Sequence, residues 1–163
     1  LGSLDKVHYN GLEFELNARL TDNLNLNLGI AVMDSEIKAD ASIPHVIGRQ
    51  VPLVSDSTFN LGATYTKPLS GGGLDFVVRG DYRRIGKTYW GPGDPGTTPL
   101  PWDQSPRDPV GVLDLRMGVQ ADDWSVMFWS KNLLDEEYND EFTHPFVWKA
   151  LPRRWGVQYT KSF

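Results

Sequence analysis

The sequence contains no cysteine, and it has no apolar run of the length that a membrane-spanning helix needs. Without cysteine, the chain has neither a disulfide framework nor a thiolate metal site. A spanning helix takes about 20 mostly apolar residues, so the sequence predicts no helical transmembrane segment. The same absence does not exclude a transmembrane β-barrel, because the strands of such barrels give a much weaker hydropathy signal.

A basic excess and a signal peptide are also missing. The 163 residues include 16 Lys and Arg against 21 Asp and Glu, a formal net charge of -5, so the charge does not predict nucleic acid as a partner. The first residues, LGSLDKVHY, have neither a basic n-region nor an apolar h-region, so they do not form a signal peptide. We therefore expect the chain to begin within a longer protein.

What the sequence has from end to end is an alternation of apolar and polar residues, as in NLNLNLGIAVMD over residues 23–34. Seven segments alternate in this way, at residues 12–20, 24–33, 59–65, 74–83, 113–120, 124–131 and 154–163. A period of two indicates β-strands, and no segment predicts a helix. One face of each strand therefore meets either the core of a soluble sandwich or the lipid around an outer-membrane barrel.

The connections between these segments favour the barrel. Short turns alternate with long irregular stretches, which cover residues 35–54, 90–109 and 134–151. Connections in soluble domains have a median of about 4–6 residues, whereas outer-membrane barrels combine tight periplasmic turns with long extracellular loops. The strand lengths agree, because a tilted strand needs about 9–11 residues to cross the hydrocarbon.

Glycine, asparagine and charges of both signs fill the polar sides of the strands. Such a surface suits a crowded aqueous lumen, in which charges on neighbouring strands pair. The charged residues that this parity assigns to the lumen are Asp75, Arg79, Asp81, Arg83, Asp114 and Arg116. A shift of one residue in the phase would overturn the assignment. The alternative is the solvated outer face of a sandwich.

Two motifs near the end of the chain resemble those of TonB-dependent outer-membrane receptors. The segment WSKNLLDEEYND, residues 129–140, resembles their penultimate strand and the loop after it, with an Asn-Leu-x-Asp followed by Tyr. The segment LPRRWGVQYTKSF, residues 151–163, resembles their last strand, and Lys161 departs from it because the family usually has a hydrophobic or aromatic residue there. The matching residues are Asn132, Leu133, Asp135, Tyr138, Pro152, Arg153, Trp155, Gly156, Val157, Tyr159 and Phe163.

The resemblance implies an all-β, antiparallel transmembrane barrel of 22 strands that encloses an N-terminal plug domain. Residues 1–163 would be the C-terminal portion of that barrel, with about seven strands, and the plug and earlier strands would be absent. The implied function is energy-coupled uptake of a scarce substrate, a ferric siderophore or similar iron complex, across the bacterial outer membrane. No cofactor is implied.

The resemblance also implies partners and residue roles. The partners would be outer-membrane lipid, the receptor's own plug domain, the TonB complex, the barrel-assembly machinery and an external small-molecule substrate, with no nucleic acid. The six charged lumen residues would face the plug. The barrel-assembly signal would consist of Trp155, Val157, Tyr159 and Phe163.

Candidate substrate contacts lie in the long loops, which would form the extracellular mouth of the barrel. Aromatic and charged residues there offer platforms for a ferric siderophore, a haem or a sugar, although the aromatic residues could instead pack the loops against each other. The candidates are Trp90, Trp102, Asp103, Arg107, Phe142, His144, Phe146 and Trp148.

The sequence does not predict an enzyme. Its three histidines, His8, His45 and His144, lack the close spacing to other ligands that a zinc site shows. The glycines at 71–73 form a turn, since no helix or Lys-Ser/Thr pair of a phosphate loop follows them. Two alternatives to the receptor remain, a passive porin-like or adhesin-like barrel and a soluble all-β binding module.

Overall fold

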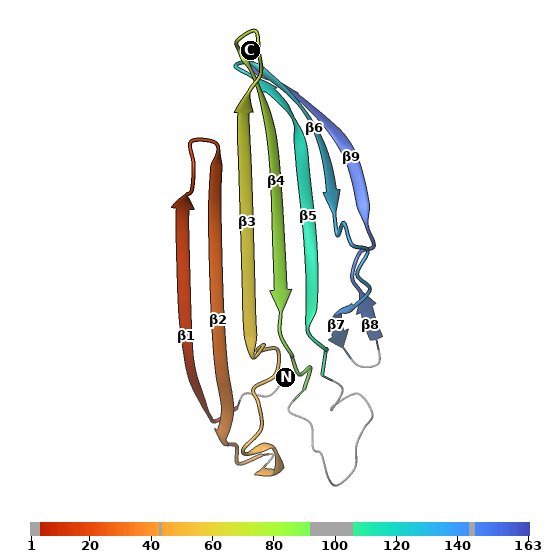
Figure 1. Cartoon of the computed structure of the whole chain (residues 1–163). Helices are drawn as coiled ribbons and strands as arrows, with labels where there is room; N and C mark the ends of the chain where they lie inside the picture. Colours follow the sequence, from red (N-terminus) through yellow and green to blue (C-terminus); the bar gives the residue numbers. More distant parts are fainter. Residues whose placement is uncertain (1–3, 43, 92–105, 144–145) are drawn as a thin grey trace.

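The computed structural model describes residues 4–42, 44–91, 106–143 and 146–163. Seven strands form one antiparallel sheet in the order β1-β2-β3-β4-β5-β6-β9, so that strands adjacent in the sheet follow each other along the chain up to β6 (Figure 1). Their bounds are β1 Lys6–Arg19, β2 Leu24–Ala39, β3 Ser57–Pro68, β4 Leu74–Ile85, β5 Val110–Ala121, β6 Trp124–Lys131 and β9 Arg154–Lys161. Within the described ranges, no helix is long and apolar enough to cross a membrane.

The segment between β6 and β9 differs from the prediction. The sequence predicted a long irregular loop over residues 134–151, but β7 (Asn139–Thr143) and β8 (Phe146–Lys149) pair there as a separate antiparallel hairpin. Aromatic and β-branched residues such as Phe142, Val147 and Trp148 favour strands, which is the physical reason for the difference. A 3-10 helix of three residues, η1 (Pro44–Val46), lies in the first long loop.

The register of the sheet places the alternating residues of all seven strands on two chemically different faces. Directly opposite residues of an antiparallel pair project to the same face. Phe14 lies opposite Ile30, and Ile30 lies opposite Phe59. The alternation predicted from the sequence is thus continuous across the sheet. The apolar face includes Leu12, Phe14, Leu16, Ile30, Leu61, Tyr82, Met117, Val126, Trp155, Val157 and Tyr159.

No second layer covers the apolar face in the part of the chain that the structure describes. Trp155 and Val157 on β9 are 69% and 68% exposed, and Leu12 on β1 is 79% exposed. The first and last strands, β1 and β9, are the open edges of the sheet. A soluble sandwich would bury this face against another sheet, whereas a wall surrounded by lipid leaves it uncovered.

Short turns lie at one end of the sheet and long connections at the other, as Figure 1 shows. The turn between β3 and β4 contains three consecutive glycines, Gly71, Gly72 and Gly73, all with positive φ. A side chain would strain this backbone conformation, which explains the glycine run without a phosphate-binding role.

The longest strands, β1 and β2, continue past the end of β3 and support the first long loop. Residues 24–32 of β2 pair with β3, and the rest of β2 pairs with β1 alone. Residues 40–42 and 44–56 fold back over this extension, where Ile37, Val46 and Val51 are buried against each other. Leu4, Val7 and Val54 pack against these three residues. We call residues 33–42 and 44–56, together with Leu4 and Val7, the loop cap.

Candidate functional site

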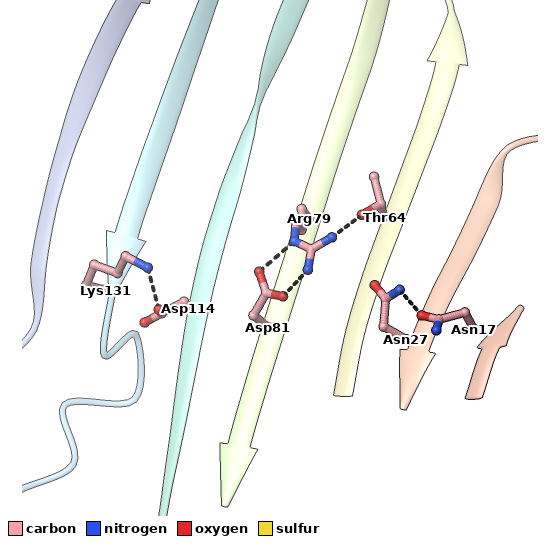
Figure 2. Close-up of polar contacts among 7 residues, drawn as sticks. All are labelled: Asn17, Asn27, Thr64, Arg79, Asp81, Asp114 and Lys131. Carbon is pink, nitrogen blue, oxygen red and sulfur yellow. Dashed lines mark hydrogen bonds and ion pairs between the residues drawn. The ribbon is translucent and has the colours of Figure 1, made fainter. Parts of the chain in front are cut away.

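The polar face of the sheet carries a cluster of hydrogen-bonded side chains around Arg79 on β4. The Arg79 guanidinium binds both carboxylate oxygens of Asp81, with Nε donating to Oδ2 at 2.8 Å, and its Nη1 donates to Thr64 Oγ1 on β3 at 3.0 Å (Figure 2). A Cβ atom at Gly62 would lie 3.0 Å from both Arg79 Nη2 and Asp81 Oδ1. Glycine at position 62 therefore makes room for this ion pair.

Two further contacts join neighbouring strands on the same face. Asn27 Nδ2 on β2 donates to Asn17 Oδ1 on β1 at 2.7 Å, and Lys131 Nζ on β6 pairs with Asp114 Oδ2 on β5 at 2.6 Å (Figure 2). The other oxygen of Asp114 accepts a hydrogen bond from the backbone N–H of Asn132 at 3.0 Å. Polar side chains thus join three separate pairs of neighbouring strands, β1 with β2, β3 with β4 and β5 with β6.

All six charged residues predicted for the lumen lie on this polar face. Asp81 is opposite Asp114 and Arg79 is opposite Arg116, while Asp75 is opposite Gln120. Like charges therefore face each other across β4 and β5, and the expected pairing between these strands does not occur. Asp81 instead pairs within its own strand with Arg79, and Asp114 pairs with a lysine that the sequence analysis did not select.

A concave area of about 500 Å³ lies over β1 to β5 on the polar face. Its floor includes Gly29 and Gly62, and Glu15 and Arg83 line it from β1 and β4. Glu15 and Arg83 form no hydrogen bond or ion pair with any described residue. The area therefore presents a free carboxylate on one side and a free guanidinium on the other.

Tryptophan is the unexpected residue of the polar face. Trp129 on β6 lies opposite Gly156 on β9, and a Cβ at Gly156 would lie 2.8 Å from Trp129 Cζ2. Its ring therefore covers the glycine backbone. The pairing Gly156–Trp129 was not foreseeable from either segment alone, because only the register brings them together.

Asn132 closes the turn that follows β6. It has a φ of 53°, and its side chain is buried. Its Nδ2 donates to Glu136 O at 2.9 Å and to Leu151 O at 3.3 Å, while its Oδ1 accepts from Glu136 N at 2.9 Å. Asparagine tolerates positive φ better than most residues, so one side chain fits both the backbone conformation and the hydrogen bonds.

The two receptor motifs at the end of the chain contact each other. Asp135, with a φ of 58°, accepts a hydrogen bond at 2.8 Å from the backbone N–H of Arg153 and pairs with its guanidinium at 3.6 Å. The backbone of Tyr138 accepts from Ala150 N at 2.9 Å. These residues join the loop after β6 to the segment before β9, which is a structural role.

The loop residues predicted to contact substrate fall into two groups. The Arg107 guanidinium lies 5.8 Å from the centroid of the Trp90 ring, and its Nη2 donates to Thr88 Oγ1 at 3.0 Å. Thr88 also bridges Ser55 and Arg107 through its backbone, so the β2–β3 connection meets two segments of the β4–β5 connection there. These contacts favour the loop-packing interpretation for Trp90 and Arg107.

The second group lies on the β7–β8 hairpin. Phe146 and Trp148 stack with ring centroids 5.9 Å apart and planes at 11°, and they are 59% and 49% exposed. Phe142 is opposite Val147 in the same hairpin. Three other predicted contacts, Trp102, Asp103 and His144, lie outside the described residues.

A second concave area, of about 310 Å³, lies between the end of the β4–β5 connection and the segment after β6. Arg107 and Lys149 line it together with Glu136, Glu137 and Tyr138. Arg107 was predicted from the sequence as a substrate contact, whereas Lys149, a lone lysine next to Trp148, was not. Among the described residues, no group of three or more His, Cys, Asp or Glu is placed to hold a metal ion.

Strand β9 presents the predicted barrel-assembly residues. Trp155, Val157 and Tyr159 lie on its apolar side and are more than half exposed, and Phe163 follows the end of the strand. Lys161, which departs from the family pattern, has its Nζ 3.4 Å from Asp123 Oδ2 in the short turn after β5. The lysine therefore has a carboxylate partner at the end of the sheet.

Long antiparallel strands with one apolar and one polar face, short turns at one end and long loops at the other define part of a transmembrane β-barrel wall. The family model described as TonB dependent receptor-like, beta-barrel matches residues 1–133, so the chain belongs to the TonB-dependent receptors. These receptors are outer-membrane proteins of Gram-negative bacteria. The resemblance, fold class and localisation predicted from the sequence are confirmed.

Solved structures show the same fold. The ferric yersiniabactin uptake receptor FyuA from Yersinia pestis superposes with a TM-score of 0.80 at 18% identity, over 96% of this chain and 24% of that receptor. BauA, the ferric preacinetobactin receptor from Acinetobacter baumannii, gives 0.74 at 17% identity, over 96% of this chain and 22% of that receptor. The ferripyoverdine receptor of Pseudomonas aeruginosa superposes with a TM-score of 0.73 at 18% identity, over 96% of this chain and 20% of that receptor. The chain spans about a quarter of these receptors or less.

Proposed function

We propose that residues 1–163 form the C-terminal part of the barrel wall of a receptor that takes up a ferric siderophore or similar iron complex. Uptake draws on the TonB complex of the inner membrane, which acts through a plug domain in the remainder of the receptor. The observation that carries this proposal is the superposition of nearly the whole sheet on receptors for ferric siderophores.

In this arrangement the apolar face contacts outer-membrane lipid and the polar face lines the lumen. The exposed side chains of β9 support a lipid contact, because they would be costly to leave in water. The hydrogen-bonded cluster around Arg79 supports a lumen contact, because charged groups are stabilised there by water and by the plug. Free Glu15 and Arg83 are available to the plug surface.

The long-loop end faces the cell exterior, and the β7–β8 hairpin contributes to substrate binding. The stacked Phe146 and Trp148 present an apolar platform, and Lys149 lies beside them in sequence. An iron complex with aromatic or anionic groups fits this combination. Arg107 contributes by holding Trp90 and Thr88 of its own loop in place.

Iron uptake by the complete receptor tests the proposal. We would complement a receptor-deletion strain under iron limitation and measure entry of radioactive iron from a panel of siderophores, with and without TonB. The proposal expects uptake of at least one iron complex that stops when TonB is deleted. Uptake that persists without TonB would support the passive porin-like barrel instead.

Truncation to Ala tests the hairpin's part in binding. Phe146→Ala with Trp148→Ala is expected to raise the half-saturating concentration of the transported complex about tenfold, because stacking contacts are lost. Leu134→Ala is the matched control, since Leu134 is as exposed as Phe146 at 59% but makes no stacked pair. If the double variant and Leu134→Ala change the half-saturating concentration equally, the hairpin does not contribute to substrate binding.

Expression of residues 1–163 with and without the upstream part of the receptor tests the position in the barrel. The open edges of β1 and β9 require neighbouring strands, so only the longer product should reach the outer membrane as a heat-modifiable band. A short product that is soluble, compact and free of detergent would instead support the soluble β module.

A further inference from the structure

Arg84 is a charged residue on the apolar face of the sheet. It lies opposite Phe59 of β3 and opposite Gly111 of β5, and both positions belong to the apolar parity. Its side chain is exposed and forms no hydrogen bond, ion pair or ring contact with any described residue. Its neighbour Arg83 projects to the polar face, where it lines the concave area of β1 to β5.

On β3, β4 and β5, Arg84 lies at the end of the apolar rows on the side of the long loops, while on β1 and β2 the apolar face continues by one further pair, Leu12 and Val32. Phe59, directly opposite Arg84, packs against the ring of Tyr82, which lies two residues nearer the short turns, with centroids 6.1 Å apart. Towards the loops, the chain becomes polar at once, with Ser57 Oγ donating to Asp56 Oδ1 at 2.8 Å. Arg84 therefore marks the boundary between an apolar and a polar zone.

The distance to the opposite boundary agrees with a membrane. Lys67 is the next cation on the apolar side of β3 and β4, opposite Phe76 near the short turns. From Phe76 to Arg84 the strand runs for about 27 Å at about 3.4 Å per residue. At a barrel tilt of about 40° this corresponds to about 20 Å of membrane, close to the apolar band of about 25 Å that such barrels show.

A guanidinium at this boundary needs an anion from the surroundings. Arginine stays charged in proteins, and it extends its head group out of hydrocarbon towards polar groups. Its planar fork matches phosphate with two parallel hydrogen bonds. On the long-loop side, the proposed orientation places Arg84 at the outer leaflet, whose phosphorylated glycolipid has lipid A as its membrane anchor.

We propose that Arg84 binds a phosphate group of lipid A, while the Phe59 and Tyr82 rings contact its acyl chains. The site is a lipid-binding surface on the outside of the barrel, separate from the lumen and from the substrate loops. The inference rests on the proposed function, because it requires the apolar face to lie in lipid with the long loops outside.

Lipid A binding to the complete receptor tests the site. We would purify the receptor in mild detergent, remove bound lipid, add lipid A and measure binding by native mass spectrometry. Arg84→Gln is expected to weaken binding about tenfold, as for the loss of a charge-assisted hydrogen bond. Arg84→Lys should lose less affinity for lipid A, because lysine keeps the positive charge. It should still lose some, because lysine lacks the planar guanidinium fork. Lipid A without phosphates should bind the native receptor and Arg84→Gln equally.

Arg83→Gln is the matched control, since it removes the same charge one residue away on the opposite face. It should keep lipid A binding at the native level. Equal losses in Arg83→Gln and Arg84→Gln, or no loss in Arg84→Gln, would overturn the inference. Iron uptake and heat-modifiability of the same variants distinguish this failure from that of the proposed function. If the native receptor inserts and transports iron but binds lipid A with and without phosphates equally well, the lipid site is wrong while the proposed function stands.

Discussion

The loop cap and the sheet below it use the same two strands, β1 and β2, but are stabilised in different ways. In the cap, Ile37 and Val46 are 0% and 1% exposed, so the protein supplies its own small core. In the sheet, Ile30 on the same strand is 38% exposed on the apolar face. The comparison shows that β2 passes from one environment to another along its length.

The change of environment is visible as a change of phase. Up to Val32, the even-numbered residues of β2 are apolar and project to the apolar face. Beyond it, the even-numbered Asp34 and Glu36 are polar, and the buried apolar residue is the odd-numbered Ile37. The opposite face of the strand becomes the apolar one where the loop cap begins. This switch indicates the level at which the strand leaves the membrane.

Truncation of a buried side chain in the loop cap is expected to have the largest effect, because among the described residues only the cap has a core of its own. Ile37→Ala is expected to destabilise the cap by about 2–5 kcal/mol, because it leaves a cavity in a core of very few residues. Amide hydrogen exchange of residues 40–56 in the complete receptor would measure the loss. Ile30→Ala is the control, and it should leave exchange in these residues unchanged. If Ile30→Ala exposes the cap equally, the two regions are not independent.

A charge placed on each face tests the sheet itself. Leu61→Arg puts a guanidinium on the apolar face, two residues along β3 from the Phe59 position opposite Arg84, and is expected to cost about 1–3 kcal/mol, between the costs near the interface and at the midplane. Asn60→Arg adds the same group one residue away, on the polar face, and should cost far less. Urea titration of the receptor in lipid vesicles would measure both. The reverse ranking of the two variants would mean that the lipid and lumen faces are exchanged.

The sheet could be predicted from the sequence because its alternation depends on local pattern alone. The register then aligns residues such as Leu28, Leu61 and Tyr82 on one face, as the parity requires. Where the phase changes, the pattern failed. The alternation predicts that the second strand ends near residue 34 and that a loop follows, whereas β2 continues to Ala39.

The site was less predictable than the fold, because its contacts depend on which loops meet. The six lumen charges were placed on one face, but the Arg79–Asp81 pair forms within one strand and uses space left by Gly62. Nor does the sequence indicate that Arg107 contacts Trp90 across a loop. Motif residues such as Asn132 were identified by resemblance, while their hydrogen bonds were not.

The turn after β6 connects the sheet to a long loop, and it is stabilised by hydrogen bonds of one buried side chain, Asn132, rather than by an apolar core. Asn132→Ala removes the side-chain hydrogen bonds to Glu136 and Leu151 and strains the positive φ, so a loss of about 1–3 kcal/mol is expected. Asn132→Gly keeps the backbone conformation and loses the hydrogen bonds alone. The difference between the two variants in urea titration separates strain from hydrogen bonding. Equal stability of both would show that strain contributes nothing.

The smallest effect is expected for the ion pair between the two motifs. The side chains of Arg153 and Asp135 are 48% and 47% exposed at 3.6 Å, so water screens them and Arg153→Gln should cost only about 0.2–1 kcal/mol. The hydrogen bond from the Arg153 backbone to Asp135 remains in this variant. High salt should abolish the difference from the native receptor in urea titration. A larger loss that persists in salt would mean that the guanidinium acts through its packing, as the buried residues of the loop cap do, rather than through its charge.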